Sequence, residues 1–310
     1  MIVVIAGSTG LVGSALSESF AAAGHDVVGL NRSVVDLLNL SATKRFIFEI
    51  KPQLIIDAAA KVGGIGANNT FPVEFLSDNL RIQSNLMEAA HESGVERFIF
   101  LGSSCVYPRD CDQPIKEEFL MSGPLEPTNS AYAIAKIAGI ELINSYRKEY
   151  GANWISLMPT NLYGPGDNFD LQASHVLPAL IRRFVEAVEN GSNRVTLWGS
   201  GSPRREFLHV NDLAQAVLYA SGHYNSPMHL NIGTGCDLSI RELASKVAAA
   251  AGFGGEIDWD TSKPDGTPKK VLDVSRIKAL GWEPTIRLED GIASTIAWYK
   301  EASALGKVRK

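Results

Sequence analysis

The chain opens with Met1-Ile2-Val3-Val4-Ile5-Ala6-Gly7-Ser8-Thr9-Gly10-Leu11-Val12-Gly13. Its first six residues form a short, apolar, β-branched run, which is typical of a strand buried in a parallel sheet. The three glycines follow at once, and a helical pattern of apolar residues continues to Gly24. Such glycines allow a tight turn and let a pyrophosphate approach the N-terminus of the helix. A plain glycine-rich turn is the alternative, but the strand–turn–helix context predicts a dinucleotide site at residues 7–13.

A second strand, Asp26–Leu30, is predicted to end at Asn31 and Arg32. Where NAD enzymes use an acidic side chain to bind the ribose 2′-hydroxyl, this chain has an amide and then a guanidinium. A guanidinium favours a 2′-phosphate, which a carboxylate would repel. The sequence therefore predicts NADP(H) as the cofactor, and Asp36 is placed to flank the adenine. The alternative is that Arg32 is an ordinary surface arginine.

Apolar runs at 53–57, 97–101 and 154–158 alternate with helical patterns at 71–91 and 130–150. Such alternation predicts an α/β protein with a parallel sheet, right-handed crossovers and helices on both faces. Ligands bind beyond the carboxyl ends of such strands. The small residue Ala58 would let the backbone pass close to the cofactor. Residues that follow the predicted strands, and that we place in one crevice with the glycine loop, are Lys61, Ser103, Cys105, Pro159, Thr160 and Asn161.

Tyr132 and Lys136 lie four residues apart in the predicted helix 130–150, and hence on one face of it. A nearby ammonium could lower the pKa of the phenol from about 10 by about three units, which needs roughly 4 kcal/mol. A hydroxyl of Ser103 or Ser104 could hold a substrate oxygen beside the phenol. We favour Ser103, because alternation along a strand would put it on the same side as Cys105. A bare Tyr-x-x-x-Lys is usually a solvated helix face, so its meaning depends on the dinucleotide site before it.

Length and composition narrow the class of protein. The 310 residues carry a net charge of -5, which argues against nucleic acid or an anionic membrane as a partner. No apolar run approaches about 18 residues, and the first residues are interpreted as a strand rather than a signal peptide. The three cysteines, Cys105, Cys111 and Cys236, are too few and too scattered for a zinc site and are typical of a reducing compartment. We expect a soluble, cytoplasmic protein without a bound metal.

The second half of the chain is predicted to supply a smaller lobe. We expect residues 1–165 to form a Rossmann-type NADP-binding domain with a doubly wound parallel sheet, and residues 205–235 to return to it. Residues 166–204 and 236–310 are expected to form a C-terminal α/β substrate-binding lobe. In that lobe Ser239 and Glu242 have the spacing of a capping box, which predicts a helix that runs to Ala251.

Several longer motifs resemble a single family. With the glycine loop and the Tyr–Lys pair, they are similar to GDP-L-fucose synthases, within the extended short-chain dehydrogenase/reductase superfamily of nucleotide-sugar enzymes. The resemblance covers nearly the whole chain. One departure is Ser8-Thr9, where bacterial members often have His and Arg, and it makes Arg32 more important for NADP(H). The motifs are Gly102-Ser103-Ser104-Cys105-Val106-Tyr107-Pro108 and the segments 58–65, 125–129, 158–165, 205–210 and 263–268.

The resemblance implies a reaction and a set of roles. The reaction is the NADPH-dependent 3,5-epimerisation and 4-reduction of GDP-4-keto-6-deoxy-D-mannose to GDP-L-fucose. It implies Cys105 as the base and His175 as the acid of both epimerisations, with Tyr132 donating a proton during reduction. Lys136 and the Ser103 hydroxyl would stabilise the developing anion, and Leu162 and His175 are assigned to the cofactor site as well. The family also implies a homodimer through a four-helix bundle of the helices at 72–92 and 130–150.

A GDP-sugar substrate needs cations for its diphosphate. Guanidinium groups match phosphate oxygens, and the resemblance selects Arg183 and Arg205 from two arginine pairs. Trp198 could pack against the nucleotide or in the core, and Lys263 could reach a phosphate or the ribose. We expect Ser103, Ser104 and Cys105 to contact the sugar.

The same residues are compatible with other functions. Cys105 could be a small buried residue, and His175 could merely lie near a helix start. A related GDP-keto-sugar epimerase or reductase would act on a 3,6-dideoxy or heptose substrate, and a nucleotide-sugar 4-epimerase would keep its cofactor bound. A non-catalytic NADP-binding regulator would have no reason to hold Ser103, Cys105, Tyr132, Lys136 and His175 together.

Overall fold

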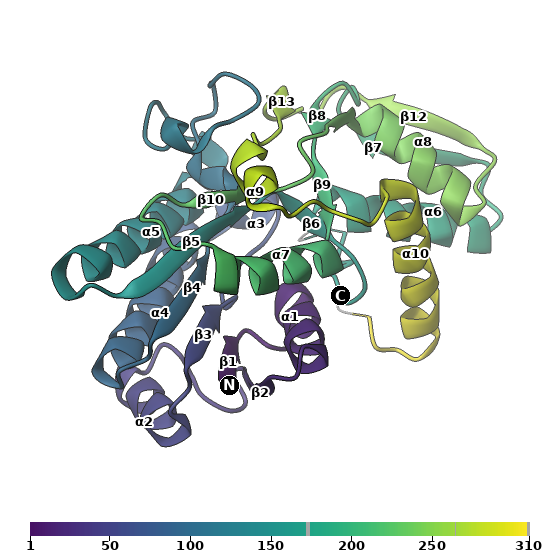
Figure 1. Ribbon diagram of the computed structural model, residues 1–310. Coiled ribbons are helices and arrows are strands. Elements are labelled where there is room, and N and C mark those ends of the chain that lie inside the picture. The colour runs from purple at the N-terminus through teal and green to yellow at the C-terminus, as the bar shows by residue number, and fades with distance from the viewer. Residues whose placement is uncertain (172–173, 264, 309–310) are drawn as a thin grey trace.

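The structure is a computed structural model that describes residues 1–171, 174–263 and 265–308, apart from the side chain of Ile65. Pro264, which belongs to the motif at 263–268, lies outside the described residues. Figure 1 shows a larger body built around a sheet, next to a smaller lobe that contains the C-terminal helix.

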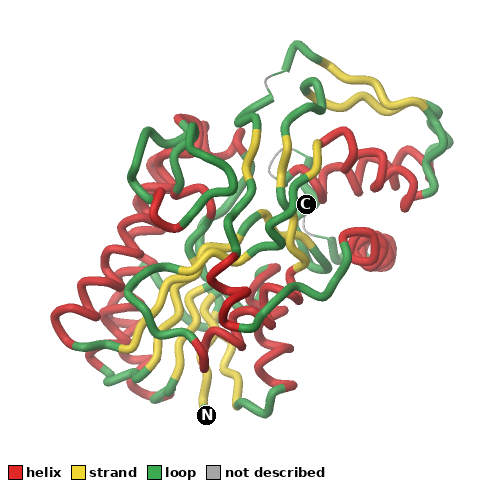
Figure 2. Tube along the Cα trace, turned by 45° about the horizontal axis from the view of Figure 1, so that its top comes forward, coloured by secondary structure: helices red, strands yellow, loops and turns green. Residues whose placement is uncertain are grey.

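In the described chain, the main sheet has six strands, all parallel, in the order β10-β5-β4-β3-β1-β2 (Figures 1 and 2). Every residue of the central strands β3 and β4 is buried, as their apolar runs predict, whereas β2 lies at the edge and is partly exposed. The strands are β1 (Ile2–Ala6), β2 (Asp26–Leu30), β3 (Leu54–Asp57), β4 (Arg97–Leu101), β5 (Asn153–Pro159) and β10 (Leu230–Ile232).

Helices cover both faces of this sheet (Figure 1). On one face α1 (Leu11–Ala22) packs against α7 (Val210–His223), and on the other α4 (Pro72–Glu92) packs against α2 (Leu40–Ile50) and α5 (Ser130–Tyr150). Their apolar faces and the strands form one hydrophobic core. This arrangement confirms the predicted Rossmann-type α/β fold.

The smaller lobe has its own hydrophobic core, formed by α6 (Val176–Glu189), α8 (Ile240–Ala251) and α10 (Leu288–Ala304) with the paired strands β7 (Arg194–Trp198) and β12 (Glu256–Asp260). The capping box of α8 is present, with Ser239 Oγ accepting from the Glu242 N–H at 3.1 Å. The shorter elements are α3 (Ile65–Thr70), α9 (Ser275–Leu280), β6 (Asn161–Tyr163), β8 (Arg204–Arg205), β9 (Phe207–His209), β11 (Leu238–Ser239), β13 (Lys269–Lys270) and three single 3₁₀ turns, η1 (Ser104–Val106), η2 (Glu117–Phe119) and η3 (Pro127–Asn129).

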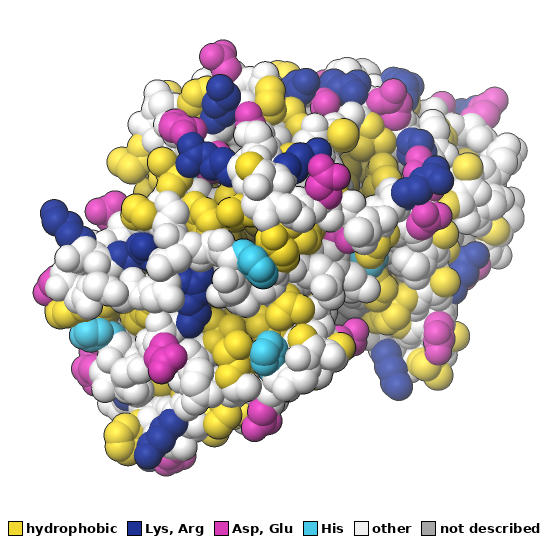
Figure 3. Space-filling model, viewed as in Figure 1, with side chains coloured by type: hydrophobic (Ala, Val, Ile, Leu, Met, Phe, Trp, Pro, Cys, Tyr) yellow, Lys and Arg dark blue, Asp and Glu magenta, His cyan; other side chains and the backbone are white. Residues whose placement is uncertain are grey.

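The surface carries charges of both signs. Figure 3 shows basic and acidic side chains interspersed on one face, in keeping with the many surface ion pairs. None of the helices in the described ranges combines the length and the apolar character needed to cross a bilayer.

Candidate active site

A cleft of about 800 Å³ lies along the carboxyl ends of the main-sheet strands and reaches the start of α6. Its volume falls in the usual range for ligand sites. The predicted site residues that line it are Gly7, Thr9, Gly10, Leu11, Val12, Arg32, Asp36, Ala58, Ser103, Ser104, Cys105, Tyr132, Lys136, Pro159, Asn161, Leu162 and His175. Ser8, Gly13, Lys61, Arg183, Trp198, Arg205 and Lys263 are not among its lining residues.

The glycine loop fits a dinucleotide. Gly7 has a φ of +78°, and a Cβ there would lie 2.7 Å from the Ala58 carbonyl oxygen. The N-cap of α1, Gly10, gives the helix no side-chain cap, so the first N–H groups of the helix are available to an anion. Gly13 lies behind the loop, where a Cβ would overlap the Gly7 carbonyl.

The other two cofactor candidates outside the lining have local partners. The backbone N–H of Ser8 donates to Leu30 O at 3.1 Å, and its side chain faces Gly29. Lys61 forms an ion pair with Glu74.

The position of Lys136 fixes the polar centre of the cleft. Its side chain is only 3% exposed, and its ammonium donates to Leu101 O at 2.9 Å. The ammonium lies 4.7 Å from the ring centroid of Phe100 and 5.9 Å from that of Tyr132. The Ser103 hydroxyl accepts from the Cys105 N–H at 3.3 Å. The chain thus brings serine, cysteine, tyrosine and lysine to one place.

The structure corrects the predicted pKa of Tyr132. Burial raises the pKa of this phenol, the charge of Cys105 raises it further, and only the Ser103 hydrogen bond opposes them. The Lys136 ammonium is directed to the Leu101 carbonyl. Tyr132 is therefore held in its protonated form at neutral pH, which is the form that can donate a proton.

Asp57 is a charged neighbour of this centre that the sequence analysis missed. It is wholly buried at the end of β3, opposite Phe100 of β4, and one carboxylate oxygen accepts from the Ala59 N–H at 3.1 Å. In the described chain the other oxygen has no hydrogen-bond partner. Burial raises the pKa of Asp57 to about 6, while the charge of Lys136 opposes that rise. An acidic residue that ends an otherwise apolar buried strand is the signal that could have identified it.

Cys105 and His175 face the same cleft from the two lobes. Cys105 is half-buried within η1, and His175 is exposed at the N-cap of α6. Burial by itself would raise the pKa of the Cys105 thiol, but the charge of Lys270 and hydrogen bonds from Ser103, Asn129 and Lys270 lower it. Surrounding protein also lowers the pKa of the His175 imidazole.

The predicted nucleotide contacts divide into two places. Arg205 is half-buried. Burial lowers the pKa of its guanidinium, and the charge of the nearby Cys105 raises it. Arg183 donates to Thr196 O of β7 at 3.4 Å, and Lys263 lies 5.7 Å from the ring centroid of Trp198, which is 65% exposed. These three therefore gather around β7, on the outer part of the smaller lobe.

The fold and this cleft define a dinucleotide-dependent enzyme with a Tyr–Lys pair. The comparison with known families agrees: residues 3–233 match the NAD dependent epimerase/dehydratase family, and the chain belongs to it.

Individual relatives are enzymes that act on GDP-sugars. The chain is 50% identical over 301 residues to "Probable GDP-L-fucose synthase 1" from Oryza sativa subsp. japonica, which covers 96% of this chain and 92% of that protein. A GDP-L-fucose synthetase from Naegleria fowleri bound to NADP superposes with a TM-score of 0.92 at 31% identity, covering 100% and 96% of the two chains. A GDP-6-OMe-4-keto-L-xylo-heptose reductase from C. jejuni gives 0.90 at 35% identity, covering 97% of both. The resemblance predicted from the motifs is confirmed.

We expect Gly13→Ala to weaken NADPH binding by at least about tenfold, which is about 1.4 kcal/mol, because the new methyl group would displace the Gly7 carbonyl and with it the loop. Fluorescence titration with NADPH measures the affinity. Gly222→Ala in α7 is the control, since a Cβ there meets no atom within 4 Å. Equal affinities in the two variants would contradict this role of Gly13.

Proposed function

We propose that this protein carries out the NADPH-dependent 3,5-epimerisation and 4-reduction of GDP-4-keto-6-deoxy-D-mannose to GDP-L-fucose. The observation that carries the proposal is 50% identity over nearly the whole chain to a relative of that name. A cleft lined by Cys105, His175, Tyr132 and Lys136 supports it, because those side chains suit both kinds of step.

NADP(H) is the cofactor, and the glycine loop with Arg32 would hold it. The uncapped N-terminus of α1 suits the pyrophosphate, and Arg32 at the cleft wall suits the 2′-phosphate. When bound, the reduced nicotinamide supplies the hydride that is transferred to C4 of the sugar. The remaining chemistry is assigned to side chains of this protein.

For the epimerisations, the C4 ketone acidifies the hydrogens at C3 and C5. The Cys105 thiolate takes the proton from one carbon and becomes a thiol, while the electron pair of the C–H bond moves onto the ketone oxygen as an enolate. His175 returns a proton to the opposite face of that carbon, which inverts it. The lowered pKa of Cys105 favours its basic form, and the lowered pKa of His175 makes its imidazolium a stronger acid.

For the reduction, negative charge develops on O4 as the hydride reaches C4. Tyr132, held in its protonated form by burial, donates its proton to that oxygen. The Ser103 hydroxyl would bind the same oxygen and, with the Lys136 ammonium, would stabilise the charge that develops on it. The GDP portion of the substrate is assigned to Arg183, Arg205, Trp198 and Lys263.

We expect Cys105→Ala to abolish solvent-deuterium incorporation at both C3 and C5, since it removes the base. Tyr132→Phe should keep that exchange but lower reduction by roughly 10² to 10⁴ fold, the usual loss for a general acid. Both are read by NMR of the sugar after incubation with the keto sugar and NADPH in D₂O. Normal exchange in the Cys105 variant would contradict the assignment of the base.

Removal of the buried carboxylate should change the pH dependence of reduction. Burial lowers the pKa of Lys136 and Asp57 raises it, so Asp57→Asn should lower the Lys136 pKa further. Lys136 would then lose its charge at lower pH, and the alkaline limb of the rate profile should move to lower pH. The control is Asp26→Asn, an exposed residue of edge strand β2. If the alkaline limb does not move in Asp57→Asn, the charge of Asp57 does not raise the pKa of Lys136.

A related GDP-keto-sugar reductase is the second candidate, because the C. jejuni heptose reductase has nearly the same fold at 35% identity. Turnover with NADPH but without deuterium at C3 and C5 would favour it. A 4-epimerase would consume no NADPH.

A homodimer through α4 and α5 is also part of the proposal. Val73 at the start of α4 and Ile134 on α5 are 75% and 48% exposed, so both apolar side chains could be covered by a second subunit. Light scattering is expected to give twice the chain mass, and Val73→Glu should lower it. A monomeric wild-type protein would contradict the dimer. The cytoplasmic location stays a prediction.

A further inference from the structure

The backbone hydrogen bonds of the turn that carries Cys105 are long. The turn is η1, a single 3₁₀ turn of three residues. The Val106 N–H donates to Ser103 O at 3.2 Å, and the Tyr107 N–H donates to Ser104 O at 3.5 Å. The first distance is at the upper end of the usual range and the second is beyond it. Contacts with the rest of the molecule therefore decide where this turn lies.

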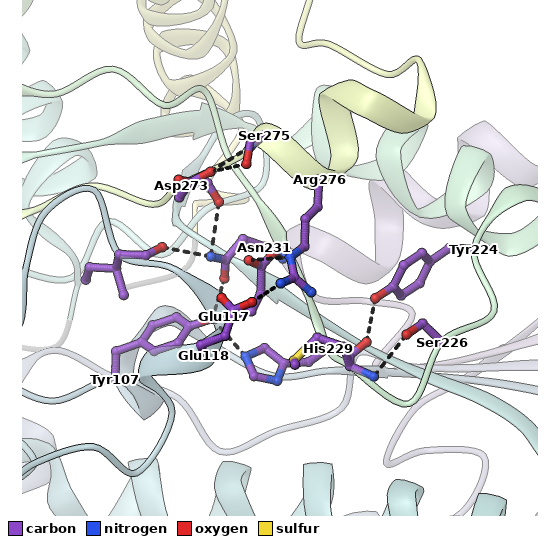
Figure 4. A network of polar contacts seen from close by, with 12 residues as sticks. Tyr107, Glu117, Glu118, Tyr224, Ser226, His229, Asn231, Asp273, Ser275 and Arg276 are labelled. Carbon is purple, nitrogen blue, oxygen red and sulfur yellow. Dashed lines mark hydrogen bonds and ion pairs between the residues drawn. The ribbon is translucent and has the colours of Figure 1, made fainter.

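The strongest of these contacts is made by Tyr107, which ends the turn. Its side chain is 2% exposed, its hydroxyl donates to Asn231 Oδ1, and the same oxygen lies 2.9 Å from His229 Nε2 (Figure 4). Asn231 belongs to β10, at the edge of the main sheet, and His229 precedes that strand directly. The residue two positions after Cys105 is thus tied to the sheet through its hydroxyl.

The Asn231 amide determines the direction of these hydrogen bonds. Its nitrogen donates to Ile115 O at 3.0 Å and to Asp273 O at 3.1 Å, so its oxygen faces the phenol as an acceptor. The hydroxyl hydrogen of Tyr107 is therefore directed to Asn231, and the His229 Nε2–H donates to the phenol oxygen. Both the donor and the acceptor capacity of the hydroxyl are used, which fixes its position.

A buried carboxylate fixes Asn231 in turn. The Asn231 N–H donates to Glu117 Oε1 at 3.1 Å, and Glu117 Oε2 lies 3.2 Å from Arg276 Nε on α9. Asn231 is wholly buried and Glu117 is 2% exposed. The network in Figure 4 thus joins the loop 107–117 to β10 and α9, which are distant from it in the sequence. The loop that follows Cys105 cannot shift without breaking these buried hydrogen bonds.

Tyr107 acts through its position and not through proton transfer. Cys105 is among the described residues that line the cleft, whereas Tyr107 is not. Burial raises the pKa of the Tyr107 phenol and lowers the pKa of His229 to about 4, so neither group changes its charge near neutral pH.

We propose that Tyr107 is a positioning residue for the epimerisations, whose anchored hydroxyl holds η1 so that the Cys105 sulfur faces C3 and C5 of the sugar. This inference rests on the proposed role of Cys105 as the base. The cofactor site does not depend on the same anchor, because the glycine loop follows β1 on the other side of the sheet centre. Loss of the hydroxyl should therefore affect proton exchange and leave NADPH binding intact.

The test is Tyr107→Phe, which removes the hydroxyl and keeps the ring. Deuterium incorporation at C3 and C5 is measured by NMR with the keto sugar in D₂O, with NADP⁺ in place of NADPH so that no reduction occurs. Its initial rate is expected to fall by about ten- to a hundredfold, because a displacement of about 1 Å can cost that much. NADPH affinity, measured by fluorescence titration, should stay that of the wild type.

Tyr163→Phe is the matched control. Tyr163 is 1% exposed in the core of the smaller lobe, and its hydroxyl donates to Leu288 O at 3.5 Å. This variant should exchange deuterium like the wild type. Equal exchange rates in Tyr107→Phe and Tyr163→Phe would overturn the inference. So would a loss of NADPH affinity as large as the loss of exchange, because it would show a general loss of structure.

A second variant and a second measurement separate this inference from the proposed function. His229→Phe removes the other partner of the hydroxyl and should slow exchange by a smaller factor than Tyr107→Phe. Alkylation by iodoacetamide, read by mass spectrometry of each cysteine peptide, should change its rate at Cys105 but not at the exposed Cys236. A changed rate at Cys105 with normal exchange would refute Cys105 as the base. A normal rate with normal exchange would overturn the role of Tyr107.

Discussion

The site depends on the parallel pairing of the main sheet. Because the strands run in one direction, their carboxyl ends all emerge at one edge, and the loops that follow must meet there. Gly7 follows β1, Ala58 follows β3, Ser103 and Cys105 follow β4, and Asn161 follows β5. A chain with the same residues in antiparallel strands would distribute them over two edges, so the sheet direction itself assembles the cofactor and sugar chemistry in one cleft.

At this edge of the sheet, the buried charge of Lys136 most strongly limits where α5 can lie. An ammonium out of water is unfavourable unless polar groups compensate it. The Leu101 carbonyl does so by a direct hydrogen bond, and the buried Asp57 acts on it through its charge. These interactions hold α5 against the ends of β3 and β4, and this fixes Tyr132, one turn earlier on the same helix, against Ser103.

Patterns of neighbouring residues predicted the features that interactions within a single helix or strand determine. The apolar run of β4, the bounds of α5 and the capping box at Ser239 were all visible in the sequence. Helix α2 was not predicted, although Asn39 caps it through a bond from the Ala42 N–H. The preference for Ser103 relied on strand alternation, yet β4 ends at Leu101 and a 3₁₀ turn carries Cys105, so turn geometry brings the two together.

The remaining features depend on contacts between distant segments, which no pattern of neighbouring residues encodes. Glu206 and Asn231 anchor Leu272 and Asp273 from distant parts of the chain, and the Lys136 ammonium on α5 donates to the backbone carbonyl of Leu101 at the end of β4. The outcome is that one cleft lowers the pKa of the Cys105 thiol and raises the pKa of the Tyr132 phenol. The proposed mechanism needs Cys105 without its proton for proton abstraction and Tyr132 with its proton for protonation of O4. Burial acts in the same direction on both acids, so the charged and polar groups around Cys105 are what lower its pKa while that of Tyr132 rises.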